Sequence, residues 1–84
     1  MQTIMIDGSR YATPEELHRA LQRMLRLPDY YGCNADALHD CLSERSEPVH
    51  LWIASRGEGP VEDTVSLVSS VIADLGGRVK EMNA

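Results

Sequence analysis

The 84-residue sequence contains no phenylalanine, one tryptophan and three tyrosines, so aromatic residues contribute little to its interior. Hydrophobic residues still make up 43% of the chain, and we expect a core built mainly from Leu, Val, Ile and Met. A chain this short buries too little surface to support two independent cores. We therefore expect a single domain over residues 1–84 that folds without a cofactor.

Positive charge is also scarce, because 8 Lys and Arg stand against 13 Asp and Glu and leave a net charge of -5. Proteins that bind DNA or RNA draw their affinity from Lys and Arg that displace phosphate counterions, so the composition argues against direct nucleic-acid binding and favours a basic partner. No apolar run approaches the roughly 20 residues needed to cross a bilayer. The opening MQTIMIDG lacks the cationic and apolar regions of a signal peptide, and we expect a cytoplasmic protein without a membrane contact.

The chain has two cysteines, Cys33 and Cys41, and neither belongs to a zinc-binding pattern. Reduced thiols are the expectation in the cytoplasm. Cys33 precedes an expected helix, where the backbone dipole can lower the pKa of a thiol. A reactive Cys33 is therefore a second hypothesis.

The first third of the chain predicts a strand followed by a helix. Residues 3–6 form a short apolar run that Asp7-Gly8 ends, as in a buried strand before a turn. Thr13 and Glu16 form a capping-box pattern that predicts a helix from residue 14, with the Glu16 carboxylate reaching back to the Thr13 amide. The helix should end before Leu27-Pro28, because proline disfavours helical geometry in the residue before it.

A second helix is expected to begin after the N-cap Asn34 and to run to about Glu44. On a helical wheel its apolar arc contains Ala37, Leu38, Cys41 and Leu42. The opposite arc is polar and contains Asp36, His39, Asp40, Ser43 and Glu44. The apolar arc is expected to face the core, which leaves the polar arc as the candidate functional surface.

The remaining residues complete an α/β pattern. Residues 49–54 (VHLWIA) are almost all apolar, which suits a central strand covered on both faces. After the loop 56–60 a helix stops at Gly76-Gly77, with an apolar side made of Val65, Leu67, Val68, Val71, Ile72 and Leu75. Residues 78–82 can form an edge strand, and the order β-α-α-β-α-β favours a small parallel sheet with right-handed crossovers.

The segment between Pro28 and Glu44 contains four acids and no Lys or Arg. Such a run is usually only a solvated helix face. Here the loop before the helix adds Tyr30-Tyr31 beside Gly32, and tyrosine brings a large contact area and a hydroxyl at little entropic cost. The segment therefore predicts an interaction surface.

Residues 27–42, LPDYYGCNADALHDCL, closely resemble the LPxYYGxNxDALWDCL signature of the barstar family. The likeness extends more loosely upstream, through Glu16-Leu17-His18, and downstream, through Glu47-Pro48 and the strand that contains Trp52. The resemblance implies a barstar-like fold, in which helices pack around three parallel strands.

The resemblance also implies that the protein is an inhibitor, not an enzyme. Its expected partner is a secreted bacterial ribonuclease, barnase-like or of another guanyl-preferring type, bound in a 1:1 complex. In barstar-like inhibitors the second helix and the loop before it plug the active site, and the aspartate that matches Asp40 takes the place of a substrate phosphate. By matching position the expected contact residues are Tyr30, Gly32, Asn34, Asp36, Asp40 and Ser43. His39, on the same helix face, is added to this set. A site that holds a phosphodiester with Arg, Lys and His would attract such carboxylates.

Two positions depart from the family pattern. His39 stands where the signature has tryptophan, which removes a flat apolar contact. The family's third-helix glutamate has no counterpart in residues 69–73, and Asp74 is not clearly aligned with it. These differences leave open an alternative, an immunity or interaction protein that neutralises a different toxin nuclease on the same scaffold.

Two weaker interpretations use the same polar arc. Asp36, His39 and Ser43 are the residue types of a hydrolytic triad, but a single helix supplies neither a pocket nor an oxyanion hole. Asp36, His39 and Asp40 would supply only part of a metal-coordination shell. We therefore expect neither an enzyme nor a metal site.

Four ring side chains outside the polar arc have simpler expectations. His18 has charged neighbours in the sequence and is expected at the surface. Tyr31 and Trp52 are expected to be packing residues. His50 is expected at a sheet face with a hydrogen-bond partner, because a buried imidazole needs one.

Overall fold

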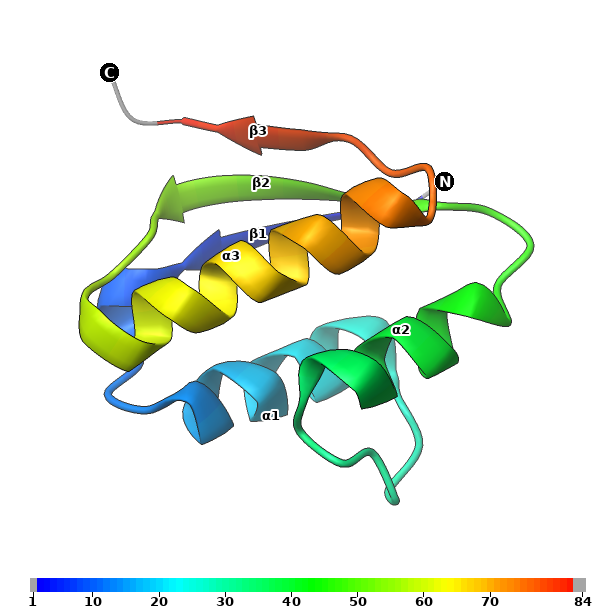
Figure 1. Ribbon diagram of the computed structural model, residues 1–84, viewed down its shortest axis with the longest axis horizontal. Coiled ribbons are helices and arrows are strands. Elements are labelled where there is room, and N and C mark those ends of the chain that lie inside the picture. The colour runs from blue at the N-terminus through cyan, green and yellow to red at the C-terminus, as the bar shows by residue number, and fades with distance from the viewer. Residues whose placement is uncertain (1, 83–84) are drawn as a thin grey trace.

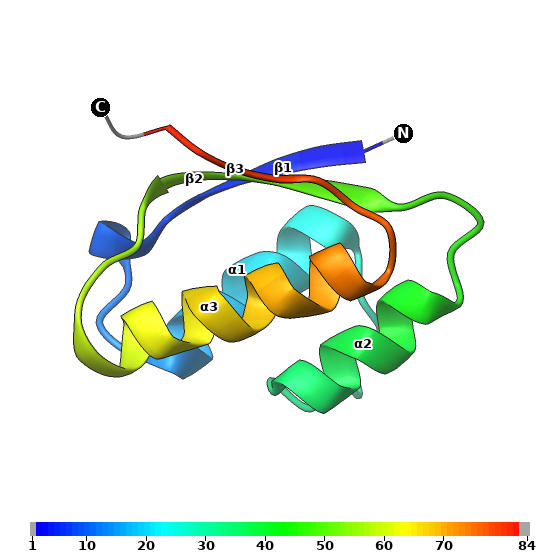
Figure 2. The same cartoon turned by 45° about the horizontal axis from the view of Figure 1, so that its top comes forward.

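In the computed structural model, which describes residues 2–82, the α-helices α1, α2 and α3 cover one face of a three-stranded sheet (Figures 1 and 2). The elements in chain order are β1 (Gln2–Asp7), the short 3-10 helix η1 (Gly8–Arg10), α1 (Pro14–Leu25), α2 (Ala35–Ser43), β2 (Val49–Ser55), α3 (Gly59–Asp74) and β3 (Val79–Glu81). All strand pairs are parallel and β2 lies in the centre. The predicted α/β class and the predicted order of strands and helices are confirmed.

The hydrophobic core lies between the sheet and the helices. Ile4 pairs in register with Leu51 and Ile6 with Ile53, and all four side chains are buried on the helix side. The helices contribute the buried residues Leu17, Leu21, Leu25, Leu38, Leu42, Val61, Val65, Val68 and Ile72. Since each buried aliphatic side chain contributes roughly 1.5–3 kcal/mol, this layer supplies most of the driving force for folding.

The opposite face of the sheet is open to solvent, so the prediction that residues 49–54 are covered on both faces is wrong. Met5 and Trp52 are register partners on the open face, and Trp52 is 41% exposed. The Nζ atom of Lys80 lies 5.4 Å from the centre of the Trp52 ring, a cation–π contact. Trp52 therefore packs across the outer surface of the sheet and not in the core, because every helix lies on the other side (Figure 2).

Helix α1 begins at Pro14, as predicted, but its cap differs in one contact. Thr13 Oγ1 accepts a hydrogen bond from the Glu16 amide at 3.2 Å. The Glu16 carboxylate accepts from the Ala12 amide at 3.0 Å, one residue before the predicted Thr13 amide. Helix α1 ends at Leu25, because Arg26 adopts a left-handed conformation with φ 53°.

Helix α3 is longer than predicted and its buried side is different. It begins at Gly59, so residues 59–60 of the predicted loop form its first turn, where proline fits well. Leu67, a predicted core residue, is 55% exposed. Thr64 is buried instead, and its hydroxyl donates to the Pro60 carbonyl at 2.9 Å, which satisfies it inside the helix.

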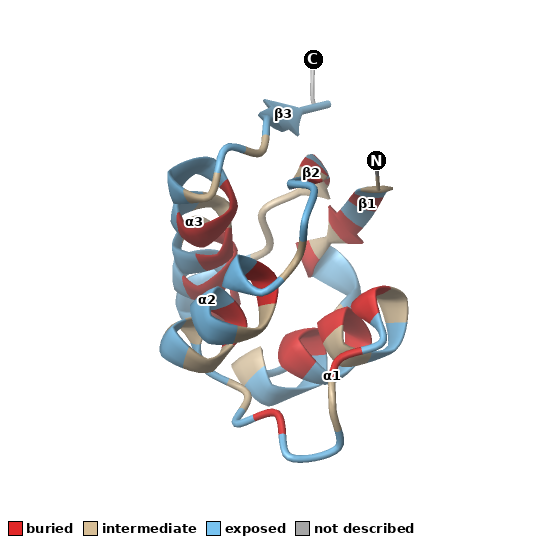
Figure 3. Cartoon of the chain, turned by 90° about the vertical axis from the view of Figure 1, so that its right-hand side faces the viewer, coloured by how far each residue is buried: buried red, intermediate tan, exposed pale blue. Residues whose placement is uncertain are grey.

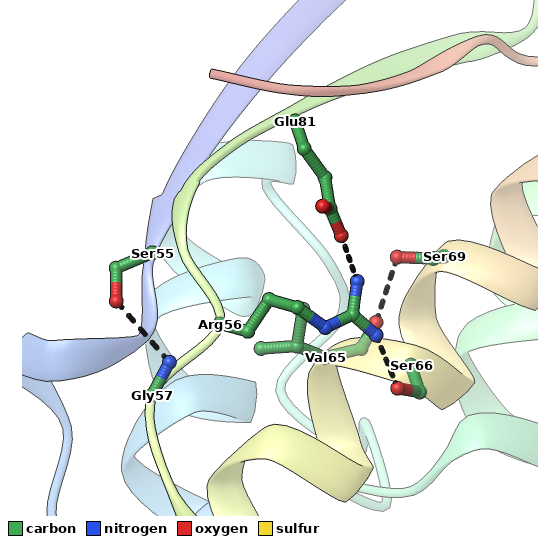
Figure 4. A network of polar contacts seen from close by, with 7 residues as sticks. All are labelled: Ser55, Arg56, Gly57, Val65, Ser66, Ser69 and Glu81. Atoms are coloured by element: carbon green, nitrogen blue, oxygen red, sulfur yellow. Dashed lines mark hydrogen bonds and ion pairs between the residues drawn. The ribbon is translucent and has the colours of Figure 1, made fainter. Parts of the chain in front are cut away.

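Side-chain hydrogen bonds of Arg56 and His50 add to the backbone pairing that holds β3 against β2. The Arg56 guanidinium bonds to the Glu81 carboxylate and to the Ser66 hydroxyl, which links β3 to α3 (Figure 4). At the other end of the strand the Arg78 amide donates to His50 Nδ1 at 2.8 Å. The predicted hydrogen-bond partner of His50 is thus the backbone at the start of the neighbouring strand.

Candidate functional site

Helix α2 has the two faces that the sequence predicts. Leu38 and Leu42 are buried and Cys41 is half-buried against the core. The side turned away from the core is exposed (Figure 3) and carries Asp36, His39, Asp40, Ser43 and Glu44. Asn34 caps the helix, because its Oδ1 atom accepts from the Ala37 amide at 2.8 Å. The cap and the buried leucines hold the polar face in a fixed orientation.

Asp36 and Asp40 are exposed, and within the described part of the chain neither has an internal counterion. They lie one helical turn apart, which places their Cβ atoms roughly 5–6 Å from each other. Within residues 2–82 the ion pairs are Asp7 with Arg10 and Arg56 with Glu81, and neither includes an acid of α2. The α2 face therefore presents at least two adjacent negative charges that are available to a partner.

The nearest cation in the sequence, Arg45, is directed away from this face. Its guanidinium donates to Gln2 Oε1 at 3.0 Å and to the Leu25 carbonyl at the end of α1. A cation is favourable there, because the carbonyl end of a helix carries partial negative charge. Arg45 is thus engaged at the end of α1 and not with Asp36 or Asp40.

The loop before α2 turns its two consecutive tyrosines in opposite directions. Tyr30 is 84% exposed, whereas Tyr31 is 5% exposed and belongs to the core. The Pro28 carbonyl accepts from the Tyr31 amide at 3.0 Å and from Gln22 Nε2 of α1 at 2.8 Å. The loop is therefore fastened to α1 at Pro28, while the Tyr30 side chain is exposed to solvent. The expectation that Tyr31 is a packing residue is confirmed.

His18 is buried under this loop, so the prediction of a surface position is wrong. It is 4% exposed, and its Nδ1 atom lies 2.6 Å from the Tyr31 hydroxyl, with ring centres 5.7 Å apart. Burial lowers the pKa of His18. Burial raises the pKa of Tyr31, and the nearby thiols of Cys33 and Cys41 raise that pKa further. At neutral pH the phenol is protonated and the imidazole uncharged, and in the tautomer that carries its proton on Nε2 the Tyr31 hydroxyl donates to Nδ1.

The lowered pKa of His18 predicts a loss of stability in mild acid. Unfolded His18 has its ordinary pKa near 6.5, whereas the folded protein takes up the proton only at lower pH. Between these values the unfolded state binds more protons, so the free energy of unfolding falls as the pH drops from about 7, by at most about 1.4 kcal/mol per pH unit. Urea unfolding of the parent and of His18→Asn between pH 8 and 5.5 measures this. The parent should lose more stability than the variant, whereas parallel profiles would contradict the assignment.

The turn that leads into α2 is tightly built. Asn34 Nδ2 donates to the Gly32 carbonyl at 3.2 Å, and a Cβ atom on Gly32 would lie 3.2 Å from that same nitrogen. Cys33, between them, has a positive φ of 54°. Cys33 and Cys41 are both free and half-buried. The reactivity of Cys33 remains a prediction.

The weaker interpretations of the polar arc find no geometric support in residues 2–82. Ser43 Oγ donates to the Asp40 carbonyl of its own helix at 2.9 Å, and no hydrogen bond joins it to His39. Among the described residues no group of three or more His, Cys, Asp or Glu side chains could hold a metal ion. Within the same part of the chain, no helix combines the length and the apolar character that crossing a membrane requires.

The sequence left Asp74, at the end of α3, without an assigned role. Ile72 and Leu75, at the end of α3, line a shallow pocket together with Leu42 and Ser43 of α2. Asp74 is the last residue of α3 and is exposed. The end of α3 thus lies beside the C-terminal end of α2, and only the packing of the two helices could have revealed this.

Comparison with known proteins agrees with the geometry. Residues 1–66 match the family described as Barstar (barnase inhibitor). A Bacillus subtilis (strain 168) protein named "Putative ribonuclease inhibitor YrdF" is 51% identical over 43 residues, which make up 51% of this chain and 47% of that protein. The alignment thus spans about half the length of this curated relative. Since the family match covers more than three quarters of the sequence, the chain belongs to the barstar family.

Proposed function

We propose that this protein inhibits a secreted bacterial ribonuclease by inserting α2 and the loop before it into the enzyme's active site. The observation that carries the proposal is the pair Asp36 and Asp40, exposed on a well-anchored helix and without an internal counterion among the described residues. An active site that binds a phosphodiester is a concentrated positive potential, and carboxylates at this spacing can occupy it in place of phosphates. Membership of the barstar family supports the same role.

The other residues of the proposed contact surface have distinct roles. Tyr30 supplies a large exposed ring for contact with the enzyme, and Gly32 lets the partner approach the backbone closely. The Asn34 side chain donates to the Gly32 carbonyl and accepts from the Ala37 amide, so it acts chiefly by shaping the turn and the start of α2. His39 and Ser43 lie along the same exposed face and complete the contact.

We further propose a 1:1 complex that forms in the cytoplasm. One inhibitor blocks one enzyme, the inhibitor contributes no catalysis of its own, and it acts in the cytoplasm without contacting RNA or a membrane. The net charge of -5 supports a basic protein partner.

A second candidate is an immunity protein that neutralises a different toxin nuclease. His39 in place of the family tryptophan favours this candidate, because it changes the chemistry at the middle of the contact surface. Titration against a panel of guanyl-preferring ribonucleases, with unrelated nuclease toxins alongside, separates the two. Stoichiometric inhibition of a guanyl-preferring enzyme supports the first candidate, and inhibition of an unrelated nuclease alone supports the second.

Association with the inhibited enzyme should depend strongly on salt. Attraction between an acidic helix and a cationic cleft acts over about a Debye length, near 10 Å at 0.1 M salt and 3 Å at 1 M. Stopped-flow measurement should therefore show the association rate constant falling by at least roughly tenfold between low and high salt, with a much smaller change in dissociation. The variant Glu62→Gln, which removes a charge from exposed α3, should keep the salt dependence of the parent. An association rate that salt leaves unchanged would exclude electrostatic steering.

A further inference from the structure

The contact between His18 and Tyr31 joins the middle of α1 to the loop that carries Tyr30. The two residues are 13 positions apart in the sequence, and both side chains are buried. The contact is short, at 2.6 Å, and it sits next to the segment that the proposed function assigns to the ribonuclease. Neither His18 nor Tyr31 belongs to the proposed contact surface, because both side chains are buried.

Few hydrogen bonds fix the conformation of the loop 29–33. From Asp29 to Cys33 the hydrogen bonds that fasten it to earlier residues are the Tyr31 amide to the Pro28 carbonyl and the Tyr31 hydroxyl to His18. Of these two, the bond to His18 alone reaches another element of the fold, whereas Gln22 of α1 holds only the start of the loop, at the Pro28 carbonyl. Tyr31 thus anchors the loop in the core, and His18 is the hydrogen-bond partner of its hydroxyl.

The chemistry of the pair favours one arrangement. A phenol hydroxyl buried among apolar side chains needs an acceptor, because an unsatisfied one loses its hydration without compensation. With its proton on Nε2 the imidazole offers Nδ1 as that acceptor, and burial favours the uncharged imidazole by lowering its pKa. Without the acceptor, Tyr31 gains by turning its hydroxyl toward water, and the neighbouring Tyr30 and Gly32 would lose their fixed positions.

We propose that His18 is a positioning residue for inhibition: through the Tyr31 hydroxyl it fixes the loop 29–33 in the shape that the ribonuclease binds. This inference rests on the proposed function. His18 does not touch the enzyme; it reduces the ordering that the loop must undergo on binding. Preorganisation of this kind acts mainly by slowing dissociation.

Three variants test the proposal at a temperature where all of them are fully folded. His18→Leu removes the acceptor, and Tyr31→Phe removes the donor. His18→Asn restores an amide oxygen near the position of Nδ1 and cannot titrate. We expect His18→Leu and Tyr31→Phe to raise the dissociation rate about tenfold, with a smaller change in association. His18→Asn should recover most of the loss, and the double variant His18→Leu/Tyr31→Phe should lose no more than either single variant.

A matched control separates positioning from general destabilisation. Ile6→Val removes one methylene from the core beneath the sheet, away from the loop. It should lower the melting temperature and leave the dissociation rate unchanged. If His18→Leu behaves like Ile6→Val, or if His18→Asn fails to recover binding, His18 is only a core residue and the proposal is wrong.

Amide hydrogen exchange of the free inhibitor keeps this test independent of the proposed function. His18→Leu should speed exchange of the Tyr31 amide relative to the amides of β2, and His18→Asn should not. Unchanged exchange in His18→Leu would overturn the positioning role even if the protein inhibits a ribonuclease. If the loop responds as expected but no ribonuclease is inhibited, the positioning of the loop stands and the proposed function fails.

Discussion

Replacing Asp40 with alanine is expected to weaken the complex with the inhibited ribonuclease by about 2–5 kcal/mol, or roughly 30-fold to several thousand-fold. That range includes measurements on the barnase–barstar pair itself, so for a member of the barstar family it is an expectation by kinship and not an independent derivation. The physical reason is that truncation leaves the cationic groups of the enzyme buried without a counterion. Among single truncations on the surface formed by Tyr30, Gly32, Asn34, Asp36, His39, Asp40 and Ser43, we expect this one to have the largest effect.

Two further variants make the Asp40 measurement specific. Asp40→Asn keeps the size of the side chain and removes its charge, so it should lose nearly as much affinity as Asp40→Ala if charge is the cause. Glu62→Ala removes an acid from the exposed side of α3 and should leave the equilibrium constant nearly unchanged. Isothermal titration or inhibition kinetics measures all three. Equal affinity of Asp40→Ala and the parent would reject the assigned role.

Replacing Gly77 with alanine is expected to lower the free energy of unfolding by about 3 kcal/mol. A Cβ atom at this position would lie 2.0 Å from the Val49 carbonyl oxygen and 2.6 Å from Ile72 Cγ2. The carbonyl belongs to the backbone at the start of β2 and cannot move without disturbing the sheet. A loss of this size is a large part of the roughly 5–15 kcal/mol that stabilises a typical domain.

The neighbouring glycine is the matched control for Gly77. Gly76 has a positive φ of 89°, but no atom outside its immediate chain neighbours lies within 4 Å of the position where a Cβ atom would be built. Gly76→Ala should therefore cost only the backbone strain, about 1–2 kcal/mol. Urea unfolding of both variants measures the difference. A Gly76→Ala variant that is less stable than Gly77→Ala would contradict the packing described at the end of α3.

The sequence predicted the second helix well, because local chemistry determines most of it. Asn34 caps the helix through a bond to a residue three positions on, and the spacing of Leu38 and Leu42 makes one face apolar. Both signals lie within a few residues of the structure that they predict. The same holds for the start of α1 and for the glycines after α3.

The sequence failed where a residue's surroundings come from distant segments. His18 has charged neighbours along the chain, but Tyr31, 13 residues later, folds over it and supplies its hydrogen-bond partner. The apolar run 49–54 suggested cover on both faces, although alternate residues meet the core and Trp52 meets solvent. Apolar runs do not specify how many layers cover them, because that number depends on where the helices cross. The prediction for Leu67 was wrong because Leu67 lies beyond the edge of the buried arc of α3, whereas Thr64 lies within that arc and its hydroxyl is satisfied by the Pro60 carbonyl.

A crystal structure of the protein bound to the ribonuclease that it inhibits would test the acidic helix most directly. We predict that residues 30–43 fill the active site and that the Asp40 carboxylate lies among the Arg, Lys and His side chains that bind the substrate phosphate. A complex in which the enzyme covers the open face of the sheet around Met5 and Trp52, and leaves α2 in solvent, would contradict the proposed mechanism.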